Sequence, residues 1–252
     1  MLIHPILNQL TQLHCLGMVE AFQEQLQQGD LSRLSFEERF GLIVEREHGH
    51  RANRRLKKRL QQATLKQQAC MQDIDYQTPR GLSQSVMQNL SLCRWTRQHE
   101  NILLTGLTGT GKTFIASALG HQACLADYSV KYIRCTRLFQ ELAIARGDGR
   151  YHKLLKSYSK IQVLILDDWG SAPMDDFGRR DLLEIMDDRH QALSTIVASQ
   201  LPLALWHDAI GDPTLADSIL DRLVHNAHKL ELTGDSLRKQ NCQVQNHDIL
   251  PV

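Results

Sequence analysis

This chain of 252 residues contains the stretch Gly106-Leu107-Thr108-Gly109-Thr110-Gly111-Lys112-Thr113, which decides its fold. The stretch satisfies the pattern G-x-x-x-x-G-K-[ST] in full, and it stands between an apolar run, 102–105, and an amphipathic segment, 113–126. Glycines in such a turn let successive backbone N–H groups point at phosphates, at the positive end of the following helix. Lys112 is expected to reach the β- and γ-phosphates of ATP, and Thr113 to offer its hydroxyl to Mg²⁺. The stretch therefore predicts a P-loop.

A second motif follows about fifty residues later, where four aliphatic residues, 163–166, end in Asp167 and Asp168. A buried strand delivers such side chains at its carboxyl end, where α/β sheets bind ligands. We expect Asp167 to hold Mg²⁺ and Asp168 to orient or deprotonate the attacking water. The alternative is that both acids are ordinary solvated turn residues.

Working outward, short β-branched or leucine-rich runs alternate with helical patterns through the second part of the chain. The expected strands are 102–105, 130–135, 163–166, 195–198 and 229–232, and the expected helices are about 83–97, 113–126, 136–158, 176–190 and 214–227. Strands spaced by helices imply βα units and a parallel sheet with both faces covered. The sequence therefore predicts an α/β domain over 83–252.

The first part of the chain reads as helix. Leucines and other apolar residues recur at helical spacing up to Leu26, Gly29-Asp30 breaks the pattern, and Ser35-Phe36-Glu37-Glu38 is a capping-box signature. The helix that starts there is expected to run to about Lys66. We predict an all-helical N-terminal domain, 1–72, that binds DNA or a partner, and a linker, 73–82, which contains Pro79 and Gly81.

Composition excludes several classes of protein. The net charge of +1 gives no overall field toward nucleic acid or membrane, so a basic patch has to be local. The longest purely aliphatic run, 163–166, is far too short to span a membrane, and the N-terminus lacks a signal-peptide pattern. The six cysteines contain no Cys-x-x-Cys pair, so a cytoplasmic location is expected and no membrane partner.

Blocks spread along nearly the whole chain carry a resemblance to a known family. Besides the P-loop they include Leu16-Gly17-Met18, Ser35-Phe36-Glu37-Glu38-Arg39, Pro79-Arg80-Gly81-Leu82, Asp167-Asp168-Trp169-Gly170 and Gly211-Asp212-Pro213-Thr214-Leu215-Ala216-Asp217. These residues resemble AAA+ ATPases of the DnaA/DnaC-like group and, more closely, the IstB-like helper ATPases of insertion-sequence transposition. The resemblance implies an α/β AAA+ P-loop domain with a truncated lid, because only about twenty residues follow the last strand.

The resemblance also implies roles for three further residues. Gln200 resembles the sensor-1 residue that reads the γ-phosphate, Arg222 the arginine finger that reaches a neighbouring subunit, and Arg238 the sensor-2 cation. Arginine suits the last two roles because its charged fork pairs bidentately with phosphate oxygens. The alternatives are a strand-end residue for Gln200, a surface residue paired with an acid such as Glu231 for Arg222, and a residue of a polar tail for Arg238. The acid pair ends Asp-Asp where many AAA+ proteins have Asp-Glu, so slow hydrolysis is expected.

A basic helix is the candidate DNA contact. The stretch 51–60 contains six cations and no acid, and the expected contacts are Arg51, Arg54, Arg55, Lys57 and Lys58. Such cations bind phosphates without reading the sequence. Taken alone the stretch is more often a solvated helix face, but the resemblance favours duplex DNA. The pairs His48/His50 and His225/His228 lack a third ligand and are not predicted to bind metal, and Trp169 and Trp206 are expected to serve packing.

Together these observations favour an ATPase that oligomerises on duplex DNA with ATP and Mg²⁺, remodels the DNA, and recruits or stimulates a cognate transposase. One alternative is a DnaC-like replicative helicase loader. Another is a nucleotide-gated architectural protein that bends DNA with negligible turnover. A small-molecule kinase is disfavoured because no acceptor-binding insertion is visible in the sequence.

Overall fold

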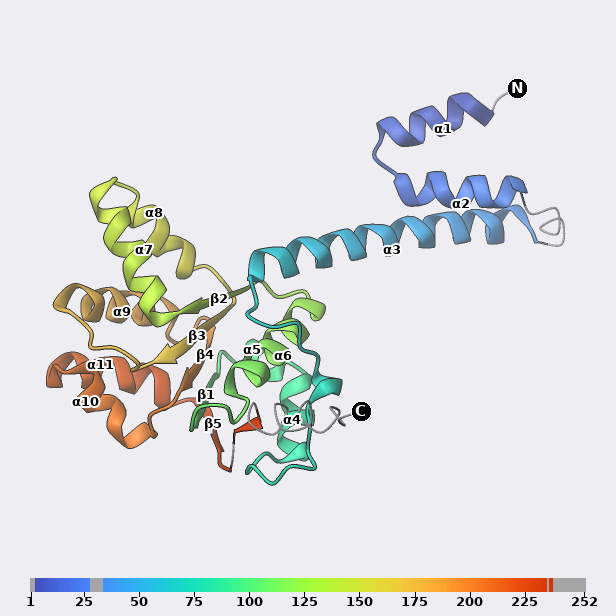
Figure 1. The fold of residues 1–252 in the computed structure, drawn as a ribbon. Helices are drawn as coiled ribbons and strands as arrows, with labels where there is room; N and C mark the ends of the chain where they lie inside the picture. The colour runs from blue at the N-terminus through green and yellow to red at the C-terminus, as the bar shows by residue number, and fades with distance from the viewer. Residues whose placement is uncertain (1–2, 28–33, 235, 238–252) are drawn as a thin grey trace, which may run out of the picture. The chain divides into compact units, whose positions relative to one another are not determined.

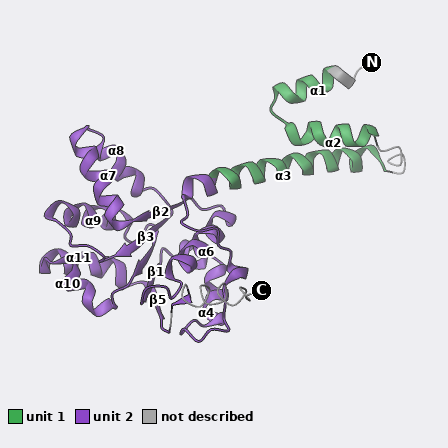
Figure 2. Cartoon of the chain, viewed as in Figure 1, with its two compact units in different colours: residues 1–58 green, residues 59–252 purple. Residues whose placement is uncertain are grey.

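The chain consists of two compact units, residues 1–58 and 59–252 (Figure 2). The computed structural model describes residues 3–27, 34–234 and 236–237. The division falls inside helix α3 (Phe36–Ala63), whereas the sequence places the linker at 73–82. Residues 59–82 belong to the second unit, where the side chains of Ala69 and Ile74 are buried. The expected linker is thus part of the packed structure of the second unit.

The first unit contains α1 (Ile3–Gln12), α2 (Leu16–Gln27) and the larger part of α3. The capping box at the start of α3 is confirmed: Glu38 N–H donates to Ser35 Oγ over 3.2 Å, and Ser35 N–H donates to Glu38 Oε2 over 2.8 Å. The helix ends at Ala63, three residues before the predicted end. The expected break at Gly29-Asp30 lies outside the described residues.

Close packing of α2 on α3 depends on Gly17. A Cβ atom at this position would lie 2.8 Å from both Arg46 O and Glu47 Cα. The neighbouring Met18 N–H donates to Glu47 Oε2 over 3.2 Å. Burial alone would raise the pKa of Glu47, but hydrogen bonds from Arg51 and from the backbone of Met18 and Gly17 lower it below its ordinary value. A small residue and a buried carboxylate therefore join these two helices.

The second unit is built on a five-stranded parallel sheet in the order β2-β3-β4-β1-β5 (Figure 1). The strands are β1 (Asn101–Gly106), β2 (Val130–Arg134), β3 (Val163–Trp169), β4 (Ser194–Ser199) and β5 (Ala227–Leu232). Helix α6 (Lys112–Leu125) covers one face, and α7 (Cys135–Gly147), α9 (Asp176–Arg189) and α11 (Pro213–Val224) cover the other (Figure 1). The predicted parallel sheet is confirmed.

Several helices differ from the sequence-based expectation. The segment 83–97 forms α4 (Gln84–Ser91) and α5 (Arg94–Arg97), because Cys93 between them adopts a left-handed backbone with φ 53°. The segment 136–158 forms α7 and α8 (Tyr151–Tyr158), separated at Gly149, whose φ is 78°. The helix expected over 214–227 ends at Val224, and the short α10 (Trp206–Ile210) was not predicted.

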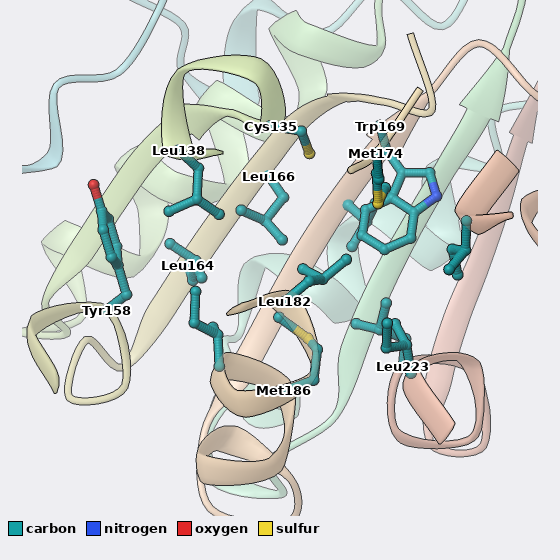
Figure 3. Packing of buried hydrophobic residues seen from close by; sticks show 14 of the residues in the cluster. Cys135, Leu138, Tyr158, Leu164, Leu166, Trp169, Met174, Leu182, Met186 and Leu223 are labelled. Atoms are coloured by element: carbon teal, nitrogen blue, oxygen red, sulfur yellow. The ribbon is translucent and has the colours of Figure 1, made fainter. Parts of the chain in front are cut away.

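The core between the sheet and α7, α9 and α11 is apolar, and its labelled residues in Figure 3 come from all of these elements. Trp169 and Trp206 are buried in it with ring centroids 5.1 Å apart, as their predicted packing role requires. Arg189 is buried at the edge of the same layer and donates to Tyr158 O, Ile161 O, Ser194 O and Thr195 Oγ1. Burial lowers the pKa of Arg189 to about 9.

Among the described residues, no helix has the length and apolar character needed to cross a membrane.

Candidate nucleotide site

The P-loop follows the end of β1 and leads directly into α6, as predicted. Gly109 and Gly111 have φ values of 88° and 99°, in the left-handed region that glycine adopts readily. Gly106 is required for a different reason, since a Cβ atom there would lie 2.1 Å from Leu232 O on the neighbouring strand β5. The Lys112 ammonium is nearly buried and donates to Gly106 O over 2.7 Å and to Leu107 O over 2.8 Å. The lysine therefore lies within the curve of the loop.

Asp167 lies beside the P-loop at the carboxyl end of β3. Its Oδ2 accepts hydrogen bonds from Thr113 Oγ1 over 2.9 Å and from Tyr132 Oη over 2.6 Å, and its side chain is buried. Burial and the hydrogen bond to Asp167 raise the pKa of Tyr132 above its ordinary value, so this phenol stays a donor. A hydroxyl and a carboxylate are the oxygen ligands that Mg²⁺ prefers, and the predicted pair Thr113 and Asp167 fits that ion.

Asp168 follows in a β-bulge. Leu166 pairs with Val197 and Trp169 with Ser199, so two residues of β3 lie opposite the single Ala198 of β4. Asp168 adopts a left-handed backbone with φ 57°, and its Oδ2 lies 3.2 Å from Arg134 Nε. A bulge re-aims side chains at the rim of a sheet. Here it directs the two neighbouring acids to different partners.

Gln200 lies at the end of β4 and meets the P-loop, because Thr108 Oγ1 donates to Gln200 Oε1 over 2.6 Å. Five of the eight predicted P-loop residues, the acid pair and Gln200 thus line one hollow of about 500 Å³; the five are Thr108, Gly109, Gly111, Lys112 and Thr113. That volume lies within the range of small-molecule sites. The order β3-β4-β1 explains the convergence, since the carboxyl ends of these three adjacent parallel strands share one edge of the sheet.

Sequence reasoning missed several residues that line the hollow and also Tyr132, which does not line it but donates to Asp167. Tyr132 and Arg134 lie two positions apart on β2, which borders β3, and the alternation of a strand places both on one face. Lys66, Gln67, Asp73, Asp75 and Arg80 line the hollow from the segment before α4, and Leu237 lines it from beyond β5. Leu237 N–H donates to Gly109 O over 3.0 Å. In the sequence, the polar end of β2 and the block 79–82 were the features that could have pointed to these residues. Neither feature by itself indicates that they lie beside the P-loop.

Among the described residues, no cluster of three or more His, Cys, Asp or Glu side chains is arranged to hold a metal ion. A Mg²⁺ ion held by Thr113 and Asp167 would therefore complete its coordination with phosphate oxygens and water, as Mg²⁺ usually does.

Comparison with known proteins identifies the family. The family model described as "IstB-like ATP binding protein" matches residues 8–245. The chain belongs to the IstB-like ATP binding protein family. An insertion sequence ATP-binding protein of Sinorhizobium fredii is 48% identical over 239 residues, which cover 95% of this chain and 98% of that relative. The insertion sequence IS21 ATP-binding protein of Pseudomonas aeruginosa is 30% identical, over 98% of this chain and 93% of that relative.

Solved structures show that the second unit of this IstB-like chain has the AAA+ fold. The DnaI structure matches 66% of this chain and 92% of its own length with TM-score 0.55 and 21% identity. The DnaC helicase loader matches 66% of this chain and 97% of its own length with TM-score 0.54 and 20% identity. DnaA from Aquifex aeolicus matches 74% of this chain and 58% of its own length with TM-score 0.57 and 17% identity. The predicted AAA+ P-loop fold is confirmed.

Arg222 of the IstB-like chain does not join the hollow. It forms an ion pair with Asp187 and donates from Nη1 to Ser218 O over 2.6 Å, so its acid partner is not Glu231. Its backbone carbonyl accepts a hydrogen bond from Asn101 Nδ2 over 3.1 Å. Asn101 starts β1 and the P-loop follows the end of that strand, so Arg222 lies at the opposite edge of the sheet from its own chain's P-loop.

The remaining predicted residues of the IstB-like chain are outside this site. Arg238 lies outside the described residues. Most of the residues after the last strand, on which the predicted truncated lid depends, lie outside them as well. The five candidate DNA contacts, Arg51, Arg54, Arg55, Lys57 and Lys58, are all exposed on α3. Arg51 differs from the other four because it forms an ion pair. Its Nε lies 2.6 Å from Glu47 Oε1, and the carboxylate neutralises its charge locally.

Proposed function

We propose that this chain is an ATP-dependent, DNA-binding helper of transposition, which assembles on duplex DNA, remodels the target, and recruits or stimulates a partner transposase. The observation that best supports the proposal is the convergence of P-loop residues, Lys112 and Thr113 among them, with Asp167, Asp168 and Gln200 on one hollow. The relatives support the setting, since they are named as ATP-binding proteins of insertion sequences.

The chemistry proposed for the hollow is hydrolysis of the terminal phosphate of ATP. The P-loop N–H groups and Lys112 would bind the phosphates, and Thr113 with Asp167 would hold Mg²⁺, which would supply positive charge to the phosphates. Water attacks the γ-phosphorus, the bond from that phosphorus to the bridging oxygen breaks, and ADP carries away the electron pair. Asp168 orients the water and accepts its proton. Gln200 would contact the γ-phosphate, and its hydrogen bond with Thr108 would orient its side chain for this contact.

Arg134 fits this proposal as a residue that fixes the direction of Asp168. Its guanidinium lies 3.2 Å from the Asp168 carboxylate, and both line the hollow. The Arg134–Asp168 pair is partly exposed, so its own contribution to folding is small. Its effect would instead be on kcat, because the water and the carboxylate have to meet in one geometry.

Assembly is the second element of the proposal. Arg222 lies away from its own P-loop, so it would act on ATP held by a neighbouring copy, and ATP would serve as the assembly switch. Arg238 would supply a further cation as sensor 2. The exposed cations on α3 would contact phosphates of the duplex. The affinity of the chain for DNA would therefore fall as the salt concentration rises.

Particle mass by light scattering tests the assembly, with ATP or ADP and with or without a duplex of about five helical turns. We expect large particles only with ATP and duplex together. Lys112→Ala should stay small under every condition, because it lacks the phosphate-binding charge. A wild-type chain that stays monomeric or dimeric under every condition would overturn the proposed assembly. Particle growth without detectable phosphate release would instead favour the architectural alternative.

A matched pair of variants tests the role of Arg222. Arg222→Ala and Asp187→Ala both remove the same ion pair, but only the first removes the cation. If Arg222 acts on a neighbour's ATP, Arg222→Ala should abolish assembly and Asp187→Ala should preserve it. An equal loss in both variants would show that the ion pair alone matters, and normal assembly of Arg222→Ala would overturn the proposed role of Arg222.

The helicase-loader alternative is supported only by fold, since DnaC and DnaI are about 20% identical to this chain. A pull-down with the full chain separates the two functions. Recovery of a hexameric helicase and preference for single-stranded DNA would favour the loader. Recovery of the transposase and preference for duplex DNA would favour the helper.

A further inference from the structure

Arg80 is a cation buried beside the P-loop. It comes from the segment before α4, only 4% of its surface is exposed, and it lines the same hollow as Lys112. Its Nη1 lies 3.4 Å from Thr110 O, and its Nη2 donates to Asp75 O. A Cβ atom on Gly111 would lie 2.8 Å from Nη1. The guanidinium is therefore in contact with the turn that leads into α6.

The backbone around Arg80 holds it in place. Thr233 N–H donates to Arg80 O over 3.0 Å, and Thr233 follows directly after β5. The following Gly81 has φ 75°, and a Cβ atom there would lie 2.9 Å from Glu231 O. The segment that carries Arg80 is thus fastened to β5, the strand that borders β1. This anchoring fixes the position of the guanidinium relative to the P-loop.

The charge of Arg80 has no carboxylate within ion-pair distance in the part of the chain that the structure describes. Its hydrogen-bond acceptors are two backbone carbonyl oxygens, and its buried Nε has no partner among the described residues. The nearby Asp75 carboxylate accepts from Thr78 Oγ1 and from Gln77 N–H, and these bonds dominate the lowering of its pKa. A buried cation that is neither paired nor fully hydrogen-bonded is costly, and such groups usually meet an anion.

We propose that Arg80 is a second phosphate-binding cation, which contacts the α- or β-phosphate of a nucleoside di- or triphosphate held by the P-loop. The position supports these two phosphates, because Thr110 and Gly111 belong to the part of a P-loop whose N–H groups cradle them, whereas the lysine reaches the β- and γ-phosphates. The inference rests on the proposed binding of ATP at this loop. It assigns Arg80, from the segment before α4, a direct part in holding the nucleotide.

The test is the affinity of the full chain for fluorescent ATP and ADP, compared among Arg80→Gln, Arg80→Lys and Lys66→Ala. Arg80→Gln keeps an amide donor without the charge, and Arg80→Lys keeps the charge without the fork. Lys66→Ala is the matched control, since Lys66 is an exposed cation that lines the hollow from the same segment. Arg80→Gln should weaken ATP and ADP alike by about ten- to hundredfold, as expected for a charge-assisted bond, and Arg80→Lys by less. Lys66→Ala should weaken both by about twofold at most, because solvent screens its charge.

Adenosine separates binding of phosphate from general support of the site. Arg80→Gln should leave the affinity for adenosine, measured by competition, unchanged. An equal loss for adenosine and ADP, or equal losses in Arg80→Gln and Arg80→Lys, would overturn the inference, since the charge would then be unnecessary. If the wild-type chain binds ATP and Arg80→Gln binds it equally well, the inference fails and the proposed function stands. A wild-type chain that binds neither nucleotide would overturn both.

Discussion

Replacement of Tyr132 by phenylalanine isolates one hydrogen bond to the proposed Mg²⁺ ligand. The Tyr132 hydroxyl donates to Asp167 Oδ2 over 2.6 Å, and both side chains are buried. Phenylalanine keeps the ring and removes only this donor. Asp167 retains the bonds from Thr113 Oγ1 and from Asp168 N–H, so its carboxylate keeps two of its three partners in this network.

Two magnitudes follow for Tyr132→Phe. A hydrogen bond to a charged acceptor contributes about 1.5–3 kcal/mol, so the free energy of unfolding of the second unit should fall by about that amount. Loss of a group that orients a metal ligand weakens metal affinity by about ten- to hundredfold, so half-saturation of ATP hydrolysis by Mg²⁺ should rise by that factor. Urea unfolding followed by tryptophan emission measures the first quantity, because all three tryptophans are buried in the second unit.

Tyr158→Phe is the matched control. The Tyr158 side chain is also buried, and its hydroxyl donates to a partly buried carboxylate, Glu141 Oε2, over 2.8 Å, but neither residue lines the nucleotide hollow. It should lose a similar amount of stability and keep the Mg²⁺ dependence of the wild type. The reasoning is refuted if Tyr132→Phe leaves half-saturation by Mg²⁺ within about twofold of wild type, or if Tyr158→Phe shifts it equally.

Three further predictions concern stability. Arg189→Met should lower the unfolding free energy of the second unit by about 3–5 kcal/mol in urea, since four acceptors, three of them buried, lose their donor. A loss under about 1 kcal/mol would contradict this. Gly17→Val should reduce helical circular dichroism at 37 °C, because its Cβ would overlap the α3 backbone, whereas Gly41→Val, where the added Cβ meets nothing, should not. The pKa of Glu47 is lower in the folded protein than its ordinary value of 4.5, so the ionised carboxylate stabilises the fold at pH values above 4.5. This stabilisation is lost as the pH falls through the pKa of the folded state. Acid titration followed by circular dichroism should therefore show a smaller loss for Glu47→Gln than for wild type, and identical curves would exclude that contribution.

The elements of the fold could be predicted because their signals are local. The run 163–166 forms a buried strand, and the Ser35–Glu38 spacing starts a helix at the predicted residue. The P-loop is recognisable because its chemistry tolerates few alternatives at four positions of fixed spacing, Gly106, Gly111, Lys112 and Thr113. The interruptions at Cys93 and Gly149 were missed since a left-handed residue inside a helical pattern leaves its periodicity almost unchanged.

The missed site residues depend on contacts between distant parts of the chain. Tyr132 and Arg134 reach the acid pair because β2 borders β3, and strand order has no local signal. Arg80 lies at the P-loop because its segment is fastened to β5, whereas its Pro and Gly neighbours are typical of a linker. The bulge at 167–168 is equally hidden, since it is defined by pairing with β4.

The backbone of Asp168 constrains which acids this position accepts. Its φ of 57° lies in a region that aspartate and asparagine enter several-fold more often than most residues, and other side chains pay about 1–2 kcal/mol there. Lengthening the acid to glutamate would therefore strain the bulge as well as extend the carboxylate's reach. The backbone of this bulge therefore favours the shorter acid, and an Asp-Glu ending would carry that cost unless the pairing of β3 with β4 also changed.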